Sequence, residues 1–244
     1  MEEGAHSGRS RGAVSLRALG DLLGIALLAV ALSFVPMAAL DVSGAPLGET
    51  GAAWVFSGAL AMALLWWEWR LPLPVPAKPM RTPQPALRAL LVGLMAGLLL
   101  PLLDTAIEWS LAGLGVDAIQ AANEAPIRRA LAAAPFATLV QIVLLAPWLE
   151  ERLLRGRLFL RFRNAGMPWL GMVLTSGVFA LMHEFTPDQG QRLAEWLALI
   201  GIYAGFGMVM CLLYAWSGRL RTAIAAHAAS NLVACGLLWA EISA

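Results

Sequence analysis

Long apolar runs dominate this chain, and their lengths match those of membrane-spanning helices. A helix that crosses a bilayer needs about 20 mostly apolar residues. On that criterion we predict about seven such helices, at residues 17–40, 51–70, 87–110, 134–156, 168–186, 193–216 and 222–241. The pattern therefore predicts an all-α fold, that of a polytopic membrane protein.

The segments between the apolar runs divide the chain into four expected regions. A Pro-rich stretch, which cannot be helical, separates the second run from the third. A short amphipathic segment, APIRRALAAAP, lies between the third and fourth runs, and we place it at the membrane surface. We thus expect a cytoplasmic tail at 1–16, N-terminal transmembrane helices at 17–110, an extracytoplasmic loop at 111–133 and a transmembrane core with the candidate chemistry at 134–241.

Two pairs of glycines have the spacing that lets membrane helices approach closely. Gly93 and Gly97 are four residues apart in one apolar run, and Gly201 and Gly205 are four apart in another. Small residues at this spacing are enriched where membrane helices touch. We expect helix contacts at both pairs, but the pattern is common and does not indicate a function.

Composition and charge agree with a membrane location and predict an orientation. Hydrophobic residues make up 59% of the chain and charged residues 14%, whereas soluble domains have about 45–50% and about 25%. If the N-terminus is cytoplasmic, all but three of the 17 Lys and Arg residues fall in cytoplasmic segments, the exceptions being Arg128, Arg129 and Arg192. Because positive charge concentrates on the cytoplasmic side, we predict a cytoplasmic N-terminus, an external C-terminus and, from the Ala/Leu/Arg-rich composition, a bacterial plasma membrane.

The first candidate for chemistry is the segment LEERLLRG at the end of the fourth run. Glu151 and Arg155 are four residues apart, so they share a helix face and can form an ion pair. Glu150 points about 100° away and has no partner within its own helix. The alternative is that these charges simply mark the cytoplasmic end of the helix, but two adjacent carboxylates directly after an apolar run are costly unless they pair or function.

Two further candidates lie in later apolar runs. In FALMHEF, Phe179 and His183 are four residues apart, and in HAASN, His227 and Asn231 have the same spacing. Taken singly, each polar residue could only hold neighbouring membrane helices together by hydrogen bonds. The zinc signature H-E-x-x-H is absent, because Pro187 stands where the second histidine would be.

The depths of these groups along their helices suggest that they meet. If the fourth helix continues to about Arg163, a rise of about 1.5 Å per residue places Glu150 about 20 Å from its cytoplasmic end. The same rise places His183 at about 22 Å, Asn231 at about 21 Å and His227 at about 15 Å from the ends of their helices. The groups can then share a site near the middle of the membrane. If the helix instead ends at Gly156, Glu150 is shallow and the convergence weakens.

The ordered set of motifs resembles a known family. Residues from about 134 to 241 are similar to the type II CAAX prenyl protease family and its bacterial relatives, the CPBP (Abi) intramembrane proteases. The family's motifs are EExxxR, FxxxH and HxxxN/D, and all three occur here in order, without a departure, as Glu150-Glu151-xxx-Arg155, Phe179-xxx-His183 and His227-xxx-Asn231. Each motif is weak alone, but the ordered set is specific.

The resemblance implies hydrolysis of a peptide bond in a cavity within the membrane. It implies that Glu150 is the general base acting on a water that His183 holds, and that His227 and Asn231 stabilise the oxyanion. These roles fit general chemistry, because donors arranged in advance around a developing oxyanion often contribute more to catalysis than any other single effect. The family archetype acts on prenylated proteins, and we do not carry that substrate over.

The resemblance also gives supporting roles to Glu151 and Arg155, which would orient the helix that carries the base. We expect that no cofactor is required, since no compact ligand motif exists. A buried set of one Glu and two His could equally hold zinc with one open position, so the residues alone leave both mechanisms open.

Three functions are therefore in competition. We favour an intramembrane endopeptidase that acts on a peptide or a membrane-protein substrate, within the lipid bilayer and without a nucleic-acid partner. The second is a non-catalytic binding or immunity protein, because bacterial relatives are associated with bacteriocin immunity. The third is a proton-coupled transporter, which gains weight if Asp104 and Glu108 point inward rather than lying at the membrane interface. The oligomeric state is left open.

Overall fold

The computed structural model describes residues 83–113, 124–185 and 192–243, together with Leu73, Pro76 and Ala121. All elements in these residues are helices, as the apolar pattern predicts, and no strand occurs among them. The predicted tail at 1–16 and the predicted helices at 17–40 and 51–70 lie outside the described residues. The count of seven spans and the four regional boundaries therefore stay predictions.

Four helices correspond closely to predicted runs. They are α3 (Ala86–Gly113), α8 (Pro168–His183), α9 (Leu193–Ser217) and α10 (Leu220–Ser243). Within the described part of the chain, α3 over Ala86–Ile107, all of α9 and all of α10 are long and apolar enough to cross a membrane. The apolar helix α8 is shorter, with 16 residues.

The predicted fourth helix is a longer, segmented one. It runs without a break through α5 (Pro135–Leu139), η1 (Val140–Leu145), α6 (Ala146–Leu153), η2 (Leu154–Phe159) and α7 (Leu160–Asn164), where η1 and η2 are π-helical. The predicted end at 156 is therefore wrong, and the helix continues past Arg163. After Gly156 neither proline nor glycine occurs before the turn at Gly166, whose φ of 78° suits glycine. π-Helical turns such as η1 and η2 often mark functional sites.

The segment η2 is the centre of the fold. All six of its residues, from Leu154 to Phe159, are buried. Leu154 and Leu158 pack with Phe179 of α8 in one apolar cluster, and Phe159 packs with Met210 of α9 in a second. The charge pattern counted Arg155 and Arg157 among the residues of a cytoplasmic segment; both side chains are buried within the protein, and the side of the membrane stays a prediction.

The close approach of α3 to α10 depends on one of the two glycine pairs. A Cβ atom on Gly97 would lie 2.1 Å from the carbonyl oxygen of Ala226, and one on Gly93 would lie 2.5 Å from that of Thr222. Only glycine allows the two backbones to pass at this distance. At Gly201 and Gly205 a Cβ would meet no described atom within 4 Å, so the contact expected there is not present in the described part of the chain.

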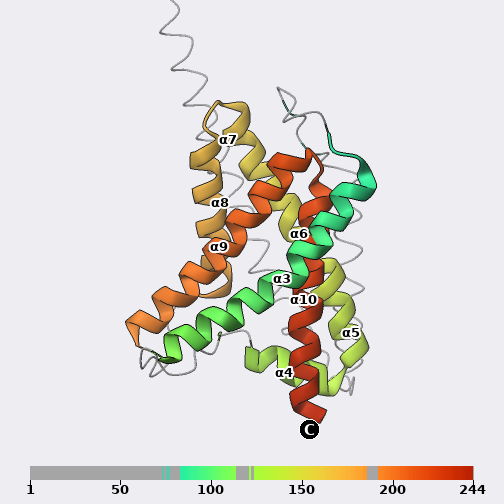
Figure 1. The fold of residues 1–244 in the computed structure, drawn as a ribbon, viewed down its shortest axis with the longest axis vertical. Helices are drawn as coiled ribbons and strands as arrows, with labels where there is room; N and C mark the ends of the chain where they lie inside the picture. Colours follow the sequence, from blue (N-terminus) through green and yellow to red (C-terminus); the bar gives the residue numbers. More distant parts are fainter. Residues whose placement is uncertain are drawn as a thin grey trace, which may run out of the picture.

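Polar contacts tie the ends of these helices together. At the beginning of α3, the Arg219 Nε donates to the Gln84 carbonyl at 2.7 Å. At the other end, α4 (Glu124–Ala133) lies beside the C-terminal end of α10 (Figure 1). There Arg128 pairs with Glu241 at 2.6 Å and with Glu124 at 3.0 Å. The hydrogen bond to Glu241, followed by the one to Glu124, raises the pKa of Arg128 above its ordinary value, so the bridge stays charged.

Candidate active site

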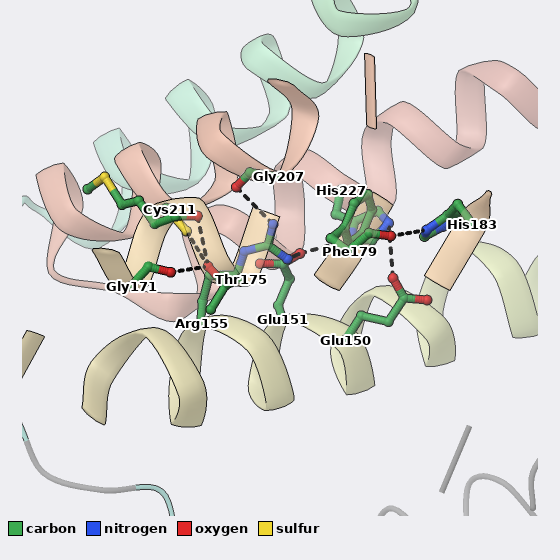
Figure 2. Close-up of polar contacts among 11 residues, drawn as sticks. Glu150, Glu151, Arg155, Gly171, Thr175, Phe179, His183, Gly207, Cys211 and His227 are labelled. Carbon is green, nitrogen blue, oxygen red and sulfur yellow. Dashed lines mark hydrogen bonds and ion pairs between the residues drawn. The ribbon is translucent and has the colours of Figure 1, made fainter. Parts of the chain in front are cut away.

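The three sequence motifs meet where α6, η2, α8 and α10 pack together. Figure 2 shows Glu150 and Glu151 rising from α6 toward the aromatic and imidazole side chains above them. Phe179 and His183 come from the last two turns of α8, and His227 comes from the first half of α10. The helices thus bring acids and imidazoles together, as their depths along the chain suggested.

Glu151 is fully buried and contacts residues of two other motif positions, Arg155 and His227. Its Oε1 accepts a hydrogen bond from Arg155 Nη1 at 2.9 Å, the local ion pair that the spacing predicted. The same oxygen accepts from His227 Nδ1 at 3.0 Å, across 76 positions of sequence. Because the Glu151 and Arg155 side chains are both 0% exposed, their charges are compensated mainly by each other and by these hydrogen bonds.

Arg155 connects Glu151 to α9 and to α8. Its Nη2 donates to the carbonyl oxygen of Gly207 at 2.8 Å. Its guanidinium also lies over the ring of Phe179, 5.1 Å from the centroid, in the arrangement of a cation–π contact. A fully buried arginine is thus held from three helical segments at once.

Glu150 has a different environment from its neighbour. Its side chain keeps 17% of its surface exposed, and its Oε2 lies 4.0 Å from His227 Nε2. That oxygen is itself buried and accepts no hydrogen bond from any described residue. Glu150 therefore has a buried carboxylate oxygen, directed at an imidazole, that remains available to a water or a substrate.

The ring of His183 is fixed by its own helix and by aromatic neighbours. Its Nδ1 donates to the carbonyl oxygen of Phe179 at 2.9 Å. The ring centroid lies 4.4 Å from that of Phe179 and 4.6 Å from that of Tyr203, the latter stacked at 23°. Since a carbonyl only accepts, the proton sits on Nδ1 and the Nε2 atom is the one left for other contacts.

Both imidazoles therefore use the same nitrogen for support. His183 binds the Phe179 carbonyl through Nδ1, and His227 binds Glu151 through Nδ1. In each ring this leaves Nε2 for chemistry, and in His227 that atom faces Glu150. Such a supporting bond fixes both the tautomer and the orientation of an imidazole.

Asn231 contacts a different part of the long helix. Its Nδ2 donates to the carbonyl oxygen of Ile142 in η1 at 2.9 Å. The π-helical pattern of η1 is visible in its last bond, in which Ala146 N–H donates to the carbonyl oxygen of Gln141, five residues earlier. The amide group expected to stabilise an oxyanion is thus partly engaged in holding η1 to α10, with one amide proton remaining.

A metal site does not follow from this geometry. Among the residues that the structure describes, no group of three or more His, Cys, Asp or Glu side chains is placed to hold an ion. The metal-free reaction and the zinc site of one glutamate and two histidines both stay predictions. Both imidazoles use Nδ1 for other contacts, His183 with the Phe179 carbonyl and His227 with Glu151.

Of the two acids considered for a proton relay, the structure describes the side chain of Asp104 alone. Asp104 is half-buried on α3, and its buried Oδ1 has no hydrogen-bond partner among the described residues. It is thus less exposed than expected of an interfacial acid, but no described hydrogen bond joins it to Glu150 or the histidines. The side chain of Glu108 lies outside what the structure describes.

Sequence reasoning missed the contribution of α9, which carries none of the three motifs. Tyr203 stacks on His183, Phe206 contacts His227, and Gly207 accepts from Arg155. The three residues are spaced i, i+3 and i+4 and so share a helix face. That spacing was available in the sequence, but α9 is apolar on all sides, so nothing distinguished the inward face.

The comparison with protein families assigns the region that contains the cluster. Residues 132–233 match the family model described as type II CAAX prenyl endopeptidase Rce1-like. The match supports the family resemblance that the three motifs indicated. The Rce1-like region extends from the end of α4 into α10 and includes every motif residue named above. No curated protein and no solved structure matches the chain.

The Rce1-like match confirms the resemblance and has two general consequences. It supports, in general terms, an intramembrane protease of the CAAX type. Together with the three helices long and apolar enough to span a bilayer, it identifies an integral membrane protein. It gives no support to a role in bacteriocin immunity.

Proposed function

We propose that this protein is an intramembrane endopeptidase in which Glu150 activates a water molecule for attack on a peptide bond. The observation that carries the proposal is the contrast between two adjacent acids. Glu151 is fully buried and bound by Arg155 and His227. Both acids have a buried Oε2 without a hydrogen-bond partner among the described residues, but Glu150 is partly exposed and its Oε2 lies 4.0 Å from the Nε2 atom of His227.

The proposed reaction moves one proton through Glu150. The carboxylate takes a proton from the water, and the resulting hydroxide adds to the carbonyl carbon of the peptide. Glu150 then returns the proton to the leaving amine as the carbon–nitrogen bond breaks. A base within hydrogen-bond reach of the water typically contributes about 10²–10⁴-fold.

The two imidazoles and Asn231 would serve the water and the oxyanion. His183 presents an unprotonated Nε2, which can accept a hydrogen bond from the water and so orient it. Glu151 orients the His227 ring through Nδ1, as a buried acid orients the histidine of a Ser-His-Asp triad, so that Nε2 can serve the oxyanion. Asn231 has a second amide proton beyond the one used by Ile142.

The substrate class follows from where the cluster lies. Glu150 and His227 lie between helices whose outer faces are apolar. Exposed residues on these faces include Leu144, Leu181 and Leu232. A peptide or a chain terminus already in the membrane could reach such a site without crossing water. We propose such a substrate, a bacterial plasma membrane location with a cytoplasmic N-terminus, and a reaction that requires no cofactor.

The proposal is tested by cleavage of candidate peptides with the purified protein in lipid nanodiscs. Glu150→Gln and His183→Ala should each abolish the formation of product masses, while Glu241→Gln, at the far end of α10, should leave cleavage intact. Thermal unfolding must show that all three variants are folded. Cleavage retained in both site variants would refute the mechanism, and binding of a peptide with its mass unchanged would favour the non-catalytic alternative.

A further inference from the structure

One face of α9 contacts each of the imidazoles and the buried arginine, although α9 contains no family motif. Tyr203 lies with its ring stacked on His183, at 4.6 Å between centroids and 23° between planes. Phe206 meets the ring of His227 at 5.0 Å and 74°, edge to face. Both arrangements are favourable geometries for aromatic pairs.

Phe179 of α8 completes this aromatic cluster. Its ring stacks on Phe206 at 5.4 Å and lies 6.3 Å from Tyr203. It also touches His183 at 4.4 Å and His227 at 5.6 Å. The two imidazoles, which come from different helices, are thus held around one shared ring, and α9 supplies the second aromatic contact to each.

Gly207 adds a backbone contact to the same face. Its carbonyl oxygen accepts from Arg155 Nη2 at 2.8 Å. A Cβ atom at this position would lie 2.9 Å from the Cα of Ser176 and 3.2 Å from Arg155 Nη2. Any larger residue would force α9 away from α8 or displace the guanidinium, so this glycine sets the distance at which α9 packs on the cluster.

We infer that the face of α9 formed by Tyr203, Phe206 and Gly207 positions the catalytic cluster, and that Tyr203 is the positioning residue for His183. The inference rests on the proposed function. The Nδ1 hydrogen bond fixes one atom of the His183 ring, and the stack on Tyr203 limits rotation about that bond, so together they define where Nε2 points. A misplacement of about 1 Å in such a group can cost about 100-fold in rate.

The first test separates the ring of Tyr203 from its hydroxyl group. Tyr203→Phe keeps the stacking and should retain kcat to within about twofold, whereas Tyr203→Leu should lower kcat about tenfold or more with a smaller change in KM. Leu212→Ala, an exposed site on the same helix, is the control and should leave kcat unchanged. If the Leu and Phe variants have the same kcat, whether unchanged or lowered, the inference is overturned.

The second test uses a matched series of glycines on α9. Gly207→Ala should lower kcat about tenfold or more, whereas Gly201→Ala and Gly205→Ala should not, because a Cβ there meets no described atom within 4 Å. If Gly207→Ala does not fold, the Tyr203 pair decides the question. Equal kcat in all three alanine variants would contradict the role of Gly207.

A readout that does not depend on hydrolysis keeps this inference separate from the proposed function. The rate at which diethyl pyrocarbonate modifies His183 can be followed by mass spectrometry. We expect a severalfold faster modification in Tyr203→Leu and the wild-type rate in Tyr203→Phe. Faster modification in a protein that cleaves no peptide would uphold the positioning role and refute the peptidase, whereas an unchanged rate would refute the positioning role itself.

Discussion

His227 Nδ1 lies 3.0 Å from Glu151 Oε1 and so joins α10 to α6 across 76 positions of sequence. This contact gives Glu151 a second partner besides Arg155 and occupies the nitrogen of His227 that faces away from Glu150. The contact therefore gives the two adjacent acids different surroundings. When neighbouring carboxyl groups have different surroundings, they commonly have different roles, and we propose a supporting role for Glu151 and a reacting role for Glu150.

The buried pair of Glu151 and Arg155 should be strongly coupled. Replacing Arg155 by Met leaves a buried carboxylate without its cation, and breaking such a pair typically costs about 3–5 kcal/mol. We expect a loss of that order in the free energy of unfolding, measured by denaturant titration in mixed micelles. Arg221→Gln is a control with an exposed arginine on α10 and should have little effect.

The double variant Glu151→Leu with Arg155→Met distinguishes coupling from lost packing. Removing both charges should recover much of the stability, because hydrophobic replacement of a whole buried ion pair is often neutral or stabilising. If the losses in the free energy of unfolding from the two single substitutions add in the double variant, the two side chains contribute to stability independently.

The glycine at the crossing of α3 and α10 should be intolerant of substitution. In Gly97→Ala the new Cβ would start 2.1 Å from the Ala226 carbonyl oxygen, so the helices must separate, and overpacking of this kind typically costs about 1–3 kcal/mol. Because Ala226 precedes His227, peptide cleavage should fall together with thermal stability.

Gly236→Ala provides the matched control for this substitution on α10. A Cβ at Gly236 meets no described atom within 4 Å, and alanine has a higher helix propensity than glycine by about 1 kcal/mol. Its stability should therefore be unchanged or slightly higher. A Gly97→Ala protein as stable as wild type would show that α3 and α10 do not pack through this glycine.

The orientation predicted from charge can be tested directly. The connection from α7 to α8 and that from α9 to α10 lie toward one end of the molecule, and α4 and the C-terminal end of α10 lie at the other (Figure 1). A reporter that is active only outside the cytoplasm, fused after residue 244, should be active. A fusion that is active only with a cytoplasmic reporter would reverse the orientation and place Arg128 and Arg192 on the cytoplasmic side.

The sequence predicted the local features of the site better than its tertiary contacts. The pairing of Glu151 with Arg155 depends only on i, i+4 spacing in a helix, and it is present at 2.9 Å. The bond from Asn231 to Ile142 depends on how α10 lies against the long helix, and no local spacing encodes that. The two glycine pairs show the same limit, because their spacing is identical and, within the part of the chain that the structure describes, only the one at Gly93 and Gly97 meets a neighbouring helix.

The end of the long helix was misplaced for a related physical reason. A charged segment such as RLLRGRLFLRFR indicates a helix end at a membrane surface if each charge must find water. In the folded protein Arg155 instead finds Glu151, the Gly207 carbonyl and the Phe179 ring. A buried charge whose partners come from other helices cannot be told from an exposed one by the sequence around it.

By itself the sequence determined the helical fold, the apolar runs and the ordered motifs, because helix periodicity and the cost of placing charge in lipid act on neighbouring residues. The tertiary structure decided which glutamate is engaged and which is available, and it made α9 part of the site through Tyr203, Phe206 and Gly207. Those features depend on the distances between helices, which are set by packing across the whole core rather than by any single segment.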